Sequence, residues 1–323
     1  MASTPLPSRV LLILFALAGT SLTGCVLNKG ITTEAASETT PVEPKTTKTE
    51  GDEAESSSIA AATEGMRKRI GFLTIFLDEE KGRILAELPS PIGPRSRCLS
   101  MLVNVGLRRG LGSNPVGLDR GQLSSAQLVE VRRLGPKVLF EIPNLRFRAP
   151  NGGEAEQRAA AESFATSVLW GTDAIAVDES GNSLIDLTEF LIRDGHGVVS
   201  TLRNSDQGSY QLDRGRSALE LGETLVFPNN VECEATLTFT TSGRPGSEVW
   251  STAPVAQAIS LVQHVSFARL PDNKYIPRAF DPRTGTFSIG YRDYSAPLDD
   301  TIEKRWATRH RLKAGDTRVR HGG

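Results

Sequence analysis

The chain has 323 residues, of which 38% are hydrophobic and 23% are charged, and its net charge at pH 7 is −1. This composition is typical of a globular protein and gives no electrostatic basis for nucleic-acid binding. The four histidines and three cysteines show neither a Cys-x-x-Cys nor a His-x-x-x-His spacing, which excludes a zinc site built from neighbouring residues.

The first residues resemble an export signal. Arg9 precedes the apolar run Val10–Gly19, which is too short to span a bilayer as a mature helix. The sequence LTGC, Leu22–Cys25, then resembles a bacterial lipobox, in which the signal is cut before the cysteine and Cys25 is lipidated. Val26, in place of an aspartate, favours the outer membrane. An ordinary secretory signal followed by an incidental cysteine is the alternative.

Residues 25–66 are rich in threonine, glutamate and serine and contain no aromatic residue. Because such a segment cannot bury enough apolar surface to offset its chain entropy, we expect a flexible tether. The expected domain plan is a signal peptide at 1–24, this tether, a β-rich module at 67–312 and an irregular tail at 313–323. If the module holds two subdomains, the break is expected near 205–212.

The module is expected to begin with two hairpins. The sequence IGFLTIFLDEEKGRILAELP has two strand patterns around a turn at Asp78–Gly82. In QLVEVRRLGPKVLFEIP the turn falls at Gly135–Pro136, and Val138, Phe140 and Ile142 share one face.

Helices and further strands follow along the chain. EAEQRAAAESFATSVLW favours a helix in its first half, and TDAIAVDESGNSLIDL favours a hairpin around a Ser-Gly-Asn turn. LTEFLIRDGHG predicts a helix with Thr188 as N-cap, Glu189 in the first turn, and Gly195 or Gly197 at its end. After Tyr210, the stretches ECEATLTFTTS, AISLVQHVSFARLP and GTFSIGYRDYS alternate as strands do. We therefore expect a mainly β fold, a β-rich α+β class, with antiparallel sheets and hairpins and one or two short helices.

Two cysteines remain beside Cys25. Cys233 is in phase with Ala235, Leu237 and Phe239, which predicts a place on the buried face of a strand. Export would put the chain in an oxidising compartment, so a disulfide between Cys98 and Cys233 stands as the alternative to a buried free thiol.

Candidate site residues are few. Asp119 and Arg120 lie in the glycine-rich stretch GLGSNPVGLDRGQL, where they are either ligand contacts or a buried pair or turn contact. Asp194 and His196 lie at an expected helix end, where His196 either interacts with the C-terminal helix dipole or takes a metal or inhibitory role. His264 falls opposite the apolar face of its strand, which predicts a surface position.

Six stretches, taken together, resemble the β-rich N-terminal region, catalogued as domains of unknown function, of a family of bacterial zinc-dependent metalloproteases. The resemblance runs from about Gly71 to Leu312, through GFLTIFLDEEKGRILAELP, GLGSNPVGLDRGQL, ESFATSVLWG, LIDLTEFLIRDGHGV, FDPRTGTFSIGYRDYSAPL and KRWATRHRL. It implies a large exported protein, often a lipoprotein. In that family, a catalytic domain with a His-Glu-x-x-His-x-x-Gly-x-x-His signature follows the segment that RHRL resembles.

This sequence contains no His-Glu pair, so none of the family's catalytic residues can be carried onto it. The resemblance therefore implies a non-catalytic N-terminal module that is propeptide-like, docking or substrate-presenting. No cofactor is expected on this chain, since zinc belongs to the family's catalytic domain. The expected partners are that domain and a membrane reached through the lipid anchor. The expected location is the bacterial cell envelope, on the periplasmic or outer side of the outer membrane.

The sequence is also compatible with two other functions. The first is a stand-alone outer-membrane lipoprotein that binds peptide or glycan. The second is a hydrolase with a dispersed site that gathers Asp119, Asp194 and His196. The tail at 313–323 departs from the family pattern, which leaves a truncation or a natural short form open. A missing partner domain would leave an exposed apolar patch near the C-terminus.

Overall fold

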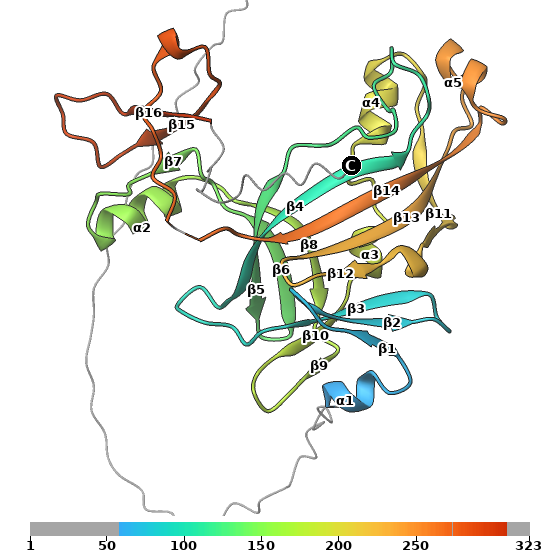
Figure 1. Cartoon of the computed structure of the whole chain (residues 1–323), viewed down its shortest axis with the longest axis horizontal. Helices are drawn as coiled ribbons and strands as arrows, with labels where there is room; N and C mark the ends of the chain where they lie inside the picture. The colour runs from blue at the N-terminus through green and yellow to red at the C-terminus, as the bar shows by residue number, and fades with distance from the viewer. Residues whose placement is uncertain (1–57, 273, 309–323) are drawn as a thin grey trace, which may run out of the picture. The chain divides into compact units, whose positions relative to one another are not determined.

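The structure, a computed structural model, describes residues 58–272 and 274–308. These residues form antiparallel sheets with a few short helices, which confirms the expected β-rich fold class (Figure 1). No helix among these residues is long and apolar enough to cross a membrane. The helices are α1 (Ile59–Ala62), α2 (Glu154–Ser163), α3 (Thr188–Leu191), α4 (Val198–Asn204) and α5 (Ser247–Thr252), with short 3-10 turns η1 (Leu221–Glu223) and η2 (Pro282–Thr284).

A five-stranded sheet contains two of the expected hairpins, the one that turns at Asp78–Gly82 and the one that turns at Ser-Gly-Asn. Its order is β1 (Arg67–Arg69), β2 (Thr74–Asp78), β3 (Arg83–Leu88), β10 (Ser183–Asp186) and β9 (Ala176–Val177). In the β2–β3 turn, Asp78 Oδ1 accepts the Lys81 N–H at 2.9 Å, and Gly82 has a φ of +65° that suits glycine. The β9–β10 hairpin turns through the predicted Ser-Gly-Asn sequence.

A larger sheet of eight strands brings early and late parts of the chain together. Its main order is β11 (Gln211–Leu219), β13 (Asn230–Thr240), β14 (Ala258–Arg269), β4 (Arg97–Arg109), β5 (Gln127–Leu134), β6 (Lys137–Ile142) and β8 (Ser167–Asp173), and β12 (Leu225–Val226) pairs with β13. The predicted β5–β6 hairpin is confirmed. Figure 1 shows the teal strand β4 beside the orange strand β14, with which it pairs in an antiparallel register.

A third, small sheet has the order β16 (Glu303–Ala307), β15 (Ser288–Asp293) and β7 (Phe147–Arg148). Strand β7 runs parallel to β15, whereas β15 and β16 are antiparallel. One face is held by aromatic stacking, since the rings of Phe147 and Phe164 have centroids 4.0 Å apart.

The main core lies between the five-stranded and eight-stranded sheets. Alternation along β5 and β6 buries Val129, Val131, Val138 and Phe140, as the sequence pattern predicts. Cys233 is fully buried in the same core with a free thiol, and Cys98 is also free and buried. Burial raises the pKa of the Cys233 thiol to about 12. The predicted buried face of Cys233 is therefore confirmed.

A second core contains apolar side chains from α4, α5, β13 and β14. The glycine-rich stretch after β4 is a loop, as expected, but Leu111, Val116 and Leu118 within it are buried in this core. The loop is thus anchored by its apolar residues and by the buried Ser113, whose Oγ donates to Glu248 at 2.6 Å, while Arg120 is exposed.

The folded region extends further toward the N-terminus than the expected boundary at residue 67. Helix α1 lies inside the segment expected to be a tether, and Ile59 packs with Phe76, Leu85 and Leu184. At the proposed break near 205–212, the chain leads from α4 directly into β11 of the same eight-stranded sheet.

The helix expected at LTEFLIRDGHG is a single turn, α3, and Thr188 is not its N-cap. Thr188 is the first helical residue, and its N–H donates to Asp186 Oδ1 at 2.8 Å. Neither Gly195 nor Gly197 ends α3. Gly197 instead precedes α4, with a left-handed φ of +86°.

Candidate functional site

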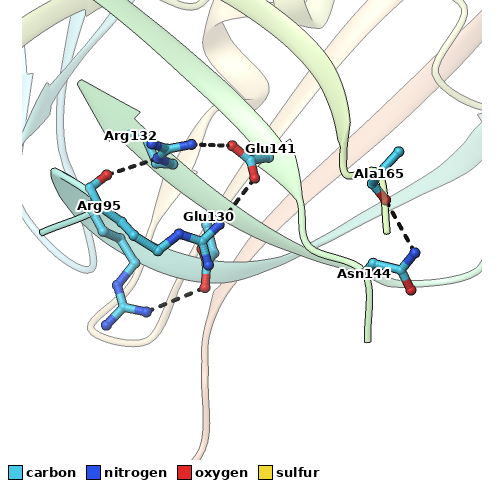
Figure 2. A network of polar contacts seen from close by, with 7 residues as sticks. Arg95, Glu130, Arg132, Glu141, Asn144 and Ala165 are labelled. Carbon is cyan, nitrogen blue, oxygen red and sulfur yellow. Dashed lines mark hydrogen bonds and ion pairs between the residues drawn. The ribbon is translucent and has the colours of Figure 1, made fainter. Parts of the chain in front are cut away.

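A polar network covers the face of β5 and β6 that points away from the main core (Figure 2). At its centre, the Glu141 carboxylate lies 2.7 Å from Arg132 and 3.2 Å from Arg95. Glu130 on β5 accepts a hydrogen bond from Arg97 at 3.3 Å. Arg132 Nε also donates to the backbone oxygen of Arg95 at 2.8 Å. The network therefore fixes the segment before β4 onto the β5–β6 hairpin.

The protonation of Glu141 indicates a structural role for this network. Burial, the largest single influence, raises the pKa of Glu141, but hydrogen bonds from Arg132 and Thr166 and the charge of Arg95 together hold the pKa below its usual range. A carboxylate kept ionised in this way is a poor proton donor and a weak base near neutral pH. Its arginine partners join β5 and β6 to the segment before β4.

A second polar cluster joins β13, β14 and β4 on the same side of the eight-stranded sheet. His264 Nε2 lies 2.7 Å from Glu232 Oε2, and His264 Nδ1 lies 3.3 Å from Glu234 Oε1. Ser266 donates to Glu232 Oε1 at 2.9 Å, and Arg108 donates to Glu234 Oε2 at 2.8 Å. His264 was expected at the surface. It lies on the face of the sheet away from the core, as expected, but these contacts leave its side chain half-buried.

The pKa values in this cluster favour the charged pair. The hydrogen bond with Glu232 raises the pKa of His264 more than burial lowers it. Burial raises the pKa of Glu232, but hydrogen bonds from His264, Asn230 and Ser266 lower it further, below its usual range. Both partners thus favour an imidazolium held between carboxylates. The sequence signal for this cluster was the Glu-Cys-Glu alternation on β13, but its pairing with β14 was needed to find the histidine.

No group of three or more histidine, cysteine, aspartate or glutamate side chains in the described ranges is arranged to hold a metal ion. The His264 cluster is no exception. Its carboxylates contact the imidazole nitrogens and do not surround a common position that a metal ion could occupy.

Asp194 lies at the beginning of α4, not at the end of a helix. Its Oδ1 accepts the N–H groups of Gly197 at 2.9 Å and Val198 at 2.7 Å, and its Oδ2 accepts that of Val199 at 2.9 Å. The carboxylate therefore caps the exposed N–H groups of the first turn. The expected interaction of His196 with a C-terminal helix dipole is wrong for the same reason, because the residue precedes α4.

The backbone around His196 is held by a side chain from β14. Gln263 Oε1 accepts the N–H groups of Gly195 at 2.9 Å and His196 at 3.2 Å. Burial lowers the pKa of His196, against a smaller opposing effect of a hydrogen bond with the Val105 backbone. His196 is therefore neutral near pH 7.

Asp119 and Arg120 do not form the buried pair that was one of their expected roles. The Asp119 backbone oxygen accepts the Gln122 N–H at 3.1 Å, so this residue makes a turn contact. Between the described residues, no hydrogen bond or ion pair joins Asp119 or Arg120 to Asp194 or His196.

Arg120 is exposed and lines a hollow of about 440 Å³ together with Arg108, Arg109, Gly110, Gly112 and Val262. Gly110 makes this arrangement possible, because a Cβ at this position would lie 2.2 Å from the Leu118 oxygen and 2.7 Å from the Arg120 nitrogen. The close approach of the two backbones brings Arg109 and Arg120 to one hollow, which we call the arginine hollow.

An apolar surface lies on the last described strands. Cross-strand pairing puts Ile289 of β15 opposite Trp306 of β16, and Phe287 and Ile302 directly precede these two strands. Phe287 is 85% exposed and Ile289 is 62% exposed, although both side chains are large and apolar. We call these residues the β15–β16 face.

The middle of the β15–β16 face packs against Arg148. The Arg148 guanidinium lies 4.0 Å from the centroid of the Tyr291 ring and 5.4 Å from that of Trp306. Burial lowers the pKa of Arg148, the charges of Tyr291 and Asp293 opposing it. The middle of the face is therefore packed, whereas Phe287 and Ile289 remain exposed.

Cys25, the expected lipidation site, lies outside the described residues.

Comparison with known proteins gives one finding. A family model described as a domain of unknown function, DUF5117, matches residues 121–314. No curated protein and no solved structure matches the chain.

Proposed function

Because the chain belongs to the DUF5117 family, whose description gives no activity, we propose that it is a non-catalytic N-terminal module of an exported, lipid-anchored zinc metalloprotease. The proposal goes further than the family match and draws on the resemblance of six sequence stretches. In this role the module docks onto the catalytic domain that carries the His-Glu-x-x-His zinc site.

The observation that carries this proposal is the exposed apolar side chains of the β15–β16 face. Burying a phenylalanine or isoleucine side chain contributes about 1.5–3 kcal/mol, so a surface that exposes several of them favours a protein partner. The resemblance puts the catalytic domain after the segment Arg309–Leu312, and β16 ends at Ala307. The apolar face thus lies in the part of the module closest in sequence to that domain.

Docking is favoured over direct blocking of a zinc site by Asp194. Each oxygen of that carboxylate is occupied by backbone N–H groups at the start of α4. Withdrawing a capping side chain costs about 0.5–2 kcal/mol, and it leaves three backbone donors without partners. Asp194 is therefore poorly placed to serve as a zinc ligand in trans.

The docking proposal predicts that substitutions on the β15–β16 face weaken binding to an isolated His-Glu-x-x-His catalytic domain of this protease family. We expect Phe287→Ser and Ile289→Ser each to weaken binding by at least about tenfold, because each removes apolar area from the contact. Isothermal titration calorimetry with the purified catalytic domain measures this.

Ile92→Ser is the matched control, since Ile92 is 65% exposed but lies in the connection between β3 and β4. Equal binding by the Phe287, Ile289 and Ile92 variants would reject docking through this face. A fall in peptidase activity on adding the module would instead support the propeptide-like version.

The anchoring part of the proposal rests on the lipobox-like sequence at Leu22–Cys25. We expect Cys25→Ser to move the protein from the outer-membrane fraction to the soluble fraction and to abolish labelling by an alkyne fatty acid. Full labelling of the Cys25→Ser protein would refute lipidation at this residue.

A further inference from the structure

Strand β14 extends past the end of its neighbour β4. On one side, β14 pairs with β13 from Ala258 to Ala268. On the other side, the pairing with β4 stops at Val262, which is opposite Arg109. The segment Ile259–Leu261 therefore has an edge that no described strand covers, whereas the Ala258 N–H donates to the Val255 oxygen at 3.1 Å.

The hydrogen bonds of β13 show which backbone groups point to this open edge. The Gln257 oxygen accepts the Thr241 N–H at 3.0 Å, so Gln257 points toward β13. Thr238, opposite Ser260, donates its N–H to Ser217 Oγ at 3.0 Å, away from β14. Because alternate residues of an antiparallel strand point to opposite neighbours, the N–H and C=O of Ser260 point to the open edge.

An apolar hollow of about 400 Å³ adjoins this edge. Its apolar lining comes from β14 itself and from the loops on either side, namely Leu111, Ala253, Pro254, Val255, Ile259 and Leu261. Val255 is 56% exposed, so apolar surface is accessible there. A hollow of this size accommodates one or two side chains of an extended ligand.

The apolar hollow shares Arg109 and Gly110 with the arginine hollow. Arg108 already donates to Glu234, whereas no ion pair within the described residues involves Arg109 or Arg120, and both are exposed. The open edge thus leads from an apolar surface to two unneutralised guanidinium groups. Such groups favour a carboxylate, to which arginine donates two parallel hydrogen bonds.

We propose that the open edge of β14 binds an extended peptide that ends in an apolar residue with a free C-terminal carboxylate. The peptide adds a short strand beside Ile259–Leu261, and its backbone bonds Ser260. Its last side chain enters the apolar hollow, and its carboxylate contacts Arg109 and Arg120. Backbone pairing distinguishes a peptide from an acyl chain, which has no N–H or C=O groups at two-residue spacing. The inference does not depend on attachment to a protease.

Peptide variants test the proposal without altering the protein. The probe is acetyl-Thr-Val-Thr-Val with a free carboxylate, titrated calorimetrically into the full chain. We expect its C-terminal amide to bind at least about tenfold more weakly, because the charge-assisted contact is lost. Two further peptides carry N-methyl groups on alternate backbone amides, one on the odd-numbered amides and one on the even-numbered amides, and we call them the two N-methylated registers. Only one of these peptides should lose binding to a similar degree, since only one set of amides pairs with β14.

Protein variants locate the site. Arg109→Gln combined with Arg120→Gln should weaken binding of the free acid by at least about tenfold and leave the amide unchanged. Arg203→Gln is the control, because Arg203 is exposed on α4. Ser260→Pro removes the edge N–H and should abolish binding, whereas Ser260→Ala keeps that N–H and should bind as the unaltered chain does.

Three results would overturn the proposal: equal affinity for the acid and the amide, full binding by both N-methylated registers, or no effect of the arginine pair. If inorganic phosphate displaces the peptide completely and the apolar residue can be replaced by glycine without loss, the hollow binds anions alone and the peptide assignment is wrong. If Ser260→Pro unfolds, the N-methylated peptides still decide the question of backbone pairing.

Discussion

His264 is held between two carboxylates of the neighbouring strand, and this contact makes the stability of the sheet depend on pH. Its pKa is raised in the folded state, chiefly by Glu232, so its contribution to the free energy of unfolding is complete below about pH 6.5 and is lost as the pH rises through the folded pKa. The pKa of Glu232 is lowered, so its contribution is present above about pH 4.3 and is lost as the pH falls through the folded value. The pair stabilises the fold most between these limits.

We predict that His264→Gln destabilises the protein more at pH 5.5 than at pH 8.5. At pH 5.5 we expect the substitution to lower the free energy of unfolding by about 0.5–1 kcal/mol. This value is reduced for solvent screening, because the His264 side chain is 35% exposed. Urea unfolding at the two pH values measures it. The same loss of stability at both pH values would show that Glu232 and Glu234 do not hold the imidazole in its protonated form.

At the scale of elements, the network of Figure 2 ties the segment before β4 to the β5–β6 hairpin, and its members differ in burial. Glu141 is 5% exposed and Arg132 is 21% exposed, whereas Arg95 is 51% exposed. Breaking the buried pair leaves an uncompensated charge, while losing the exposed partner changes little.

We therefore predict that Glu141→Gln lowers the free energy of unfolding by about 2–4 kcal/mol, since Arg132 is left without its partner. Arg95→Gln should cost less than about 1 kcal/mol. Chemical denaturation of both variants in the same buffer tests the contrast. Similar losses for the two would mean that burial does not determine the strength of these pairs.

Hairpins with strong turn chemistry were predictable from the sequence, and the turn at Asp78–Gly82 is an example. The length of α3 was not predictable, because Gln263 Nε2 donates to the carbonyl oxygens of Leu191 at 3.2 Å and Arg193 at 3.1 Å. These bonds occupy carbonyls at the end of α3 and come from a strand far along the chain. Local propensity contains no trace of such a contact.

The candidate sites were harder to predict for the same reason. The sequence marks Arg120 as a candidate in its loop, but Arg109 lies beside it only because of the close backbone approach at Gly110. The open edge of β14 depends on where β4 ends, which is a property of strand register. Alternation within a strand identifies its faces, but it does not identify its neighbours.

At the scale of the whole molecule, the family match and the folding unit have different limits. The match begins at residue 121, whereas β4 lies at Arg97–Arg109 in the middle of the eight-stranded sheet. Without β4, the core also lacks the buried side chains of Met101, Val103, Val105 and Leu107.

We predict that a fragment of residues 121–314 does not fold cooperatively, whereas a fragment of residues 58–314 does. Removing β4 exposes the pairing edges of β5 and β14 and empties part of both cores. Thermal unfolding followed by circular dichroism compares the two. A sharp transition in the shorter fragment would show that β5 and β14 can pair without β4.

The position of β4 between β5 and β14 has a consequence during synthesis. A ribosome makes β4 early and begins its neighbour β14 roughly 8–30 seconds later, at about 5–20 residues per second. Throughout that interval one side of a long, apolar strand stays bare in the nascent polypeptide, where it can pair with another copy. Production of this protein should therefore depend on a holding chaperone that shields β4 until β14 arrives.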